Sequence, residues 1–72
     1  MAAIADDIDG AAFILRLATK LFPDSANAWD SLAEITLYQG DRDAAIEYYR
    51  EALELDPEFS NAARRLEKLL KE

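Results

Sequence analysis

Three serines, Ser25, Ser31 and Ser60, are the side chains of this sequence that most resemble nucleophiles. A serine hydroxyl becomes reactive when a neighbouring base removes its proton, and that base is most often histidine. The sequence contains no histidine and no cysteine, so it lacks both an imidazole relay and thiolate chemistry. Ser25 and Ser60 also stand where helices are expected to begin, and serine is a preferred capping residue there. We therefore predict that the chain is not an enzyme and uses no cofactor.

Acidic residues near the start of the chain are a candidate for metal binding. Asp7, Asp9 and Gly10 are spaced like part of a calcium-binding loop. In that register the first ligand position falls on Ala5 and the twelfth on Arg16, and neither side chain supplies the carboxylate that calcium needs. We predict no metal site here and interpret the two aspartates as acids that stabilise the start of a helix.

The net charge limits the kind of partner that the chain can bind. Fifteen acids against eight bases give a net charge of −7, which repels nucleic acids and anionic lipids. The longest uninterrupted apolar run covers only residues 11–15, far less than the roughly 20 residues of a membrane span. The acidic start differs from a secretory signal peptide. We expect no nucleic-acid or membrane partner and a cytoplasmic location.

Composition and turn residues together predict an all-α single domain over residues 1–72. Fourteen alanines and ten leucines favour helices, and valine is absent. Helix-ending and helix-starting residues occur together at 21–25, 39–41 and 56–60. They divide the chain into four expected helices at 8–22, 26–39, 42–55 and 60–71. Apolar residues recur at helical spacing in each, and the predicted core is Trp29, Leu32, Tyr49, Leu53, Leu66 and Leu70.

A period of 34 residues runs through the chain, with Pro23 matching Pro57 and Ala18 matching Ala52. The residues that recur at defined spacings are Ala28, Trp29, Leu32, Ala33, Gly40, Ala45, Tyr49, Ala52 and Pro57. This pattern resembles the tetratricopeptide repeat, although Thr36 stands where that family usually has tyrosine. The resemblance implies an antiparallel helix-turn-helix α-solenoid fragment with one complete repeat at 26–59. It places the second helix of a partial repeat at 8–22 and a capping helix at 60–72.

The resemblance also implies a function, a protein-protein interaction module that grips an extended peptide in a groove lined by the first helix of each repeat. The groove positions are Asn27, Asp30, Ser31, Glu34, Leu37, Tyr38, Asn61, Arg64, Arg65 and Lys68. Relatives that clamp a peptide carboxylate use Lys and Asn where this chain has Asp30 and Glu34, so that clamp is absent. The alternative interpretation is a surface network in which these two acids neutralise Arg64, Arg65 and Lys68.

A second candidate function is structural, a self-association element. Phe13, Ile14, Leu17 and Leu21 form an apolar stripe, and the repeat register places Phe13 and Leu17 where a solvent-facing residue is expected. We predict a homodimer through this first helix. The segment 22–32 also resembles tetratricopeptide tails of some bacterial serine hydrolases, which implies a role as the tail of a larger bacterial enzyme.

Overall fold

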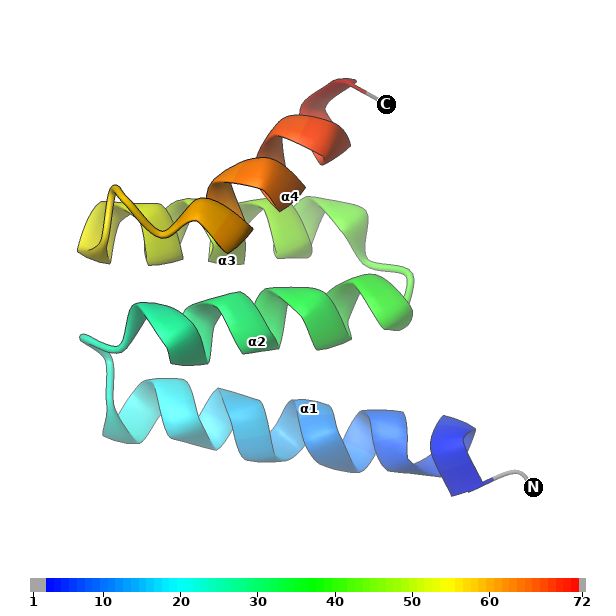
Figure 1. Cartoon of the computed structure of the whole chain (residues 1–72). Coiled ribbons are helices and arrows are strands. Elements are labelled where there is room, and N and C mark those ends of the chain that lie inside the picture. Colours follow the sequence, from blue (N-terminus) through cyan, green and yellow to red (C-terminus); the bar gives the residue numbers. More distant parts are fainter. Residues whose placement is uncertain (1–2, 72) are drawn as a thin grey trace.

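The computed structural model describes residues 3–71, which form four helices joined by short turns (Figure 1). The helices are α1 (Ala3–Leu21), α2 (Ala26–Tyr38), α3 (Arg42–Leu55) and α4 (Ser60–Lys71). Each helix packs on the one before it, α2 on α1, α3 on α2 and α4 on α3. The predicted all-α, tetratricopeptide-type fold of four helices is confirmed. Within this described part, no helix is both long and apolar enough to cross a membrane.

Three of the four helices begin and end within one residue of their predicted limits, and α1 is the exception. It begins at Ala3 instead of residue 8. The aspartates of this segment were interpreted as the first acids of a helix, but the alanines around them favour helix strongly enough to continue it upstream. The helix therefore has 19 residues and is the longest of the four described.

The turns follow the chemistry of their capping residues. The hydroxyl of Ser25 accepts a hydrogen bond from the Ala28 amide at 3.2 Å, and Asp41 accepts one from the Ala44 amide at the same distance. Gly40 has a φ of 88°, a left-handed conformation that glycine adopts without strain. Ser60 differs from its prediction, because it is the first residue of α4 and not the residue that caps it.

Small residues let the last three helices approach closely, and one aromatic ring fills the space between them. The buried cluster consists of Ala33, Ala45, Tyr49, Ala52, Ala62 and Leu69. Four of these are alanines with no exposed surface, and Tyr49 is 1% exposed. Such alternation of small and large side chains is how closely packed helices avoid voids.

The junction between α2 and α3 is closed by Trp29. Its indole Nε1 donates a hydrogen bond to the Pro23 carbonyl at 2.9 Å, and its ring lies 5.9 Å from that of Tyr48. The same side chain therefore fixes the turn before α2 and the packing of α2 on α3. Thr36, the departure from the family pattern, is buried and donates to the Leu32 carbonyl at 2.6 Å.

The predicted core contained one wrong residue. Leu70 is 57% exposed, whereas its neighbour Leu69 is 8% exposed and joins the core. The register of the complete repeat turns position 70 toward a helix that would follow α4. In the described part of the chain no such helix follows, so the Leu70 side chain stays in contact with solvent.

Candidate protein-interaction surface

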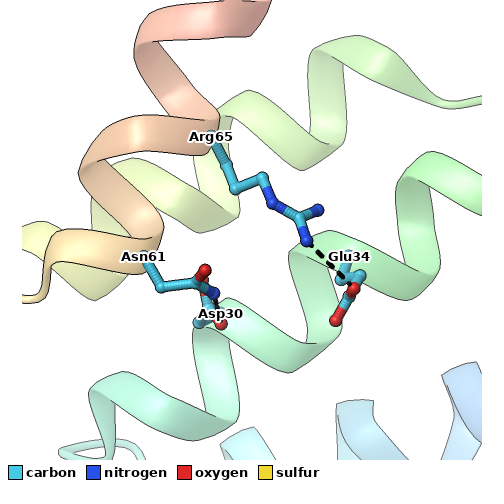
Figure 2. Close-up of polar contacts among 4 residues, drawn as sticks. All are labelled: Asp30, Glu34, Asn61 and Arg65. Atoms are coloured by element: carbon cyan, nitrogen blue, oxygen red, sulfur yellow. Dashed lines mark hydrogen bonds and ion pairs between the residues drawn. The ribbon is translucent and has the colours of Figure 1, made fainter.

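Helices α2 and α4 run beside each other and are joined by two polar contacts (Figure 2). The Asn61 amide donates to Oδ2 of Asp30 at 3.0 Å, and the Arg65 guanidinium lies 3.4 Å from Oε2 of Glu34. Both contacts join residues that are 31 apart in the sequence. This constant offset means that the two helices run parallel and that one turn of α4 matches one turn of α2.

Asp30 is a buried acid at the base of this junction, with 6% of its surface exposed. Burial raises the pKa of its carboxyl above the ordinary value, and the hydrogen bond from Asn61 only partly offsets that effect. Its Oδ1 atom has no hydrogen-bond partner among the described residues. The Asp30 side chain is therefore held inside the module, where it positions Asn61.

Tyr49 reaches the same junction from α3. Its hydroxyl is buried without a hydrogen-bond partner in the described part of the chain, and burial raises its pKa. Tyr49 and Glu34 in turn raise the pKa of Arg65, first through the field of the Tyr49 oxygen. Three helices thus contribute polar groups to one site, and Arg65 is its permanent positive charge.

The contact between Arg65 and Glu34 is half exposed, with side-chain exposures of 43% and 42%. Pairs of this kind contribute about 0 to 1 kcal/mol to stability. The predicted network of two acids and three bases is realised only at this pair. Among residues 3–71, Arg64 and Lys68 have no ion-pair partner, and Asp30 bonds to an amide instead of a base.

The other predicted groove residues lie on the outer surface of the two helices. Asn27 and Tyr38 on α2 are exposed, Tyr38 by 69%, and Ser31 and Leu37 are half-buried. Arg64 and Lys68 on α4 are exposed one helical turn apart. The surface between α2 and α4 therefore has exposed bases on its α4 side and a buried acid on its α2 side.

Two polar contacts were missed from the sequence. The bond between Asn61 and Asp30 has a sequence signal, the 31-residue offset that it shares with Arg65 and Glu34. The second contact runs from the Arg42 guanidinium, at the start of α3, to the Leu69 carbonyl near the end of α4. A cation at the carbonyl end of a helix stabilises it, but a side chain that bonds to a backbone oxygen leaves no pattern in the sequence.

The apolar stripe predicted for self-association lies on α1, away from this junction. Phe13, Ile14, Leu17 and Leu21 are 67, 64, 46 and 64% exposed. Phe13 and Leu17 also line a shallow depression together with Arg16 and Lys20.

The helix-turn-helix pair α2 and α3, followed by α4 parallel to α2, defines an α-solenoid repeat protein. A comparison with protein-family models matches residues 26–59 to the tetratricopeptide repeat. This segment of the chain is a tetratricopeptide repeat, as the sequence pattern predicted, and such repeats mediate protein-protein interaction. No curated protein matches the chain, so the resemblance to tails of bacterial serine hydrolases stays a prediction.

Proposed function

We propose that the chain is a non-catalytic protein-interaction module that binds an acidic peptide segment along the surface between α2 and α4. The family of residues 26–59 supports interaction as the general role. The observation that carries the finer proposal is the state of the α4 bases. Arg64 and Lys68 are exposed without an ion-pair partner in the described chain, whereas Arg65 is engaged by Glu34.

The division of labour within α4 supports an acidic ligand. Asn61 and Arg65 are occupied by contacts to α2, which fix the angle of the helix. Arg64 and Lys68 are four residues apart and therefore lie on one side of α4. Two cations held on a fixed helix attract carboxylates at lower entropic cost than cations on a mobile segment. An extended segment with acidic residues matches this surface in charge, and Tyr38 offers it an aromatic contact.

Charge reversal at one exposed arginine tests the proposal. Arg64→Glu should weaken binding of a fluorescein-labelled peptide of alternating Glu and Ala by about tenfold, or ~1.4 kcal/mol. The measurement is fluorescence anisotropy against increasing concentrations of the module. The melting temperature should change little, because Arg64 is exposed and an acid is tolerated in the first half of a helix.

Arg50→Glu is the matched control, because Arg50 is an exposed arginine on α3 and the change in net charge is the same. It should alter peptide affinity less than twofold, since it lies on another helix. Equal weakening by both variants would mean that only the net charge of the molecule matters. Failure of the native chain to bind the acidic peptide at all would overturn the proposal. We further expect the module to act in the cytoplasm, as its cysteine-free composition suggests.

A further inference from the structure

The apolar stripe on α1 is wider than the repeat geometry requires. A shift of 34 residues maps Ile14 onto Tyr48, which packs against Trp29 of the preceding helix. A helix placed before α1 in the same way would therefore cover Ile14. The same shift maps Phe13 and Leu17 onto exposed glutamates of α3, so such a helix would leave both of them in water. Their exposure calls for a different occupant.

Gly10 lies in line with the stripe, three to four residues before Phe13 and Ile14. It is exposed, and a Cβ atom added there would meet nothing within 4 Å. Glycine inside a helix costs about 1 kcal/mol relative to alanine, and no contact within the module requires it at this position. The stripe thus combines a gap at Gly10 with a large side chain at Leu21, its other end.

Charge is distributed unevenly along α1. Residues 1–9 contain three aspartates and no base, whereas residues 10–22 contain Arg16 and Lys20 and no acid. A second α1 helix lying antiparallel would bring the acidic start of one copy beside the basic end of the other. A parallel arrangement would place like charges together, which is unfavourable. The occupant that fits both the charge order and the gap is the same helix in the opposite direction.

We propose that two copies of the chain associate through their α1 stripes as an antiparallel, two-fold symmetric pair. In this arrangement Leu21 of one copy fills the gap over Gly10 of the other, and Ile14 packs against Leu17 of the other. Lys20 then lies near Asp9 of the second copy. Asp9 is exposed and accepts one hydrogen bond, from Gln39 at 3.0 Å through Oδ1. Because every contact occurs twice, the interface closes on itself and forms no filament.

The energy for this association comes from covering large apolar side chains. Three of the four stripe residues are more than 60% exposed in the single copy. Contiguous exposed apolar surface of this kind marks interaction sites in soluble proteins. The groove between α2 and α4 lies elsewhere on the molecule, so the proposal does not depend on peptide binding.

The oligomeric state in solution tests the proposal. Light scattering after size exclusion should give a mass that rises from 8.1 kDa toward twice that value as the concentration increases. The double variant Phe13→Glu, Leu17→Lys should stay monomeric at every concentration and keep its helical circular dichroism. The matched control is Phe22→Glu, Leu70→Lys, because these two residues are 65% and 57% exposed outside the stripe. This control should dimerise like the native chain.

A charge exchange tests the antiparallel direction. Asp9→Lys alone and Lys20→Glu alone should each weaken dimerisation by about tenfold, whereas the double exchange should restore most of it. A native chain that is monomeric at high micromolar concentration would overturn the proposal and leave the stripe to a different protein. A dimer that survives in the stripe variant, or is lost equally in the control variant, would also overturn it. Single variants that weaken dimerisation without rescue by the double exchange would overturn the antiparallel direction.

Discussion

Asp30 is an acid in a position where its charge is costly. The side chain is 6% exposed, and burial raises its pKa above the ordinary value of 3.8. The folded chain therefore holds a proton at Asp30 more tightly than the unfolded chain does. The stabilising effect of that proton is fully present below pH 3.8 and is lost as the pH rises through the folded pKa. At neutral pH the ionised carboxylate consequently lowers the stability of the module.

Asp30→Asn removes this charge while keeping an oxygen that can accept the hydrogen bond from Asn61. We expect the variant to be more stable than the native chain at pH 7, with an advantage that shrinks as the pH falls toward 3.8. Urea unfolding followed by circular dichroism at several pH values measures the difference. Asp43→Asn, at an exposed position of α3, controls for the loss of one negative charge. A variant less stable than the native chain at pH 7 would mean that Asn61 and Arg65 stabilise the ionised form.

At the scale of the helix, Leu69 and Leu70 are neighbours with opposite environments, and they give a sharp test of how α4 packs. Leu69 is 8% exposed within the core cluster, and Leu70 is 57% exposed. Leu69→Ala should cost about 2 to 5 kcal/mol, because it leaves a cavity against α3. Leu70→Ala should change stability by less than about 0.5 kcal/mol, as at other exposed sites. Thermal melts of the two variants make the comparison, and equal effects would contradict this orientation of α4.

This pair of leucines also shows where the sequence was sufficient. Helix limits followed from Pro23, Gly40 and Asp41, because those residues act on the backbone next to them. The family followed from small and large residues at fixed spacing. The inward turn of Leu69 did not follow, since the repeat pattern describes a helix packed on both sides and α4 is packed on one. The partner of Asp30 was also missed, because an amide and a base are equally suitable by spacing alone.

At the scale of the whole molecule, α4 completes a core that the repeat at 26–59 does not close alone. It contributes Ala62 and Leu69 to the buried cluster, in which Tyr49 is the large residue. Three polar contacts fasten it, two to α2 and one from Arg42 to the Leu69 carbonyl. In a stack of repeats each unit is stabilised mainly by its neighbours, so a chain this short has little stability to lose.

Removal of α4 should therefore unfold most of the module. A chain ending at residue 59 would expose the ring of Tyr49 and the close contacts of Ala52, and burying an aromatic side chain alone is worth about 1.5 to 3 kcal/mol. We expect this chain to lose the cooperative thermal transition of the full sequence in circular dichroism. Arg65→Ala in the full chain is the control, because it breaks one half-exposed ion pair and should lower stability by at most about 1 kcal/mol. A truncated chain that melts at the native midpoint would show that α1, α2 and α3 form a complete core without α4.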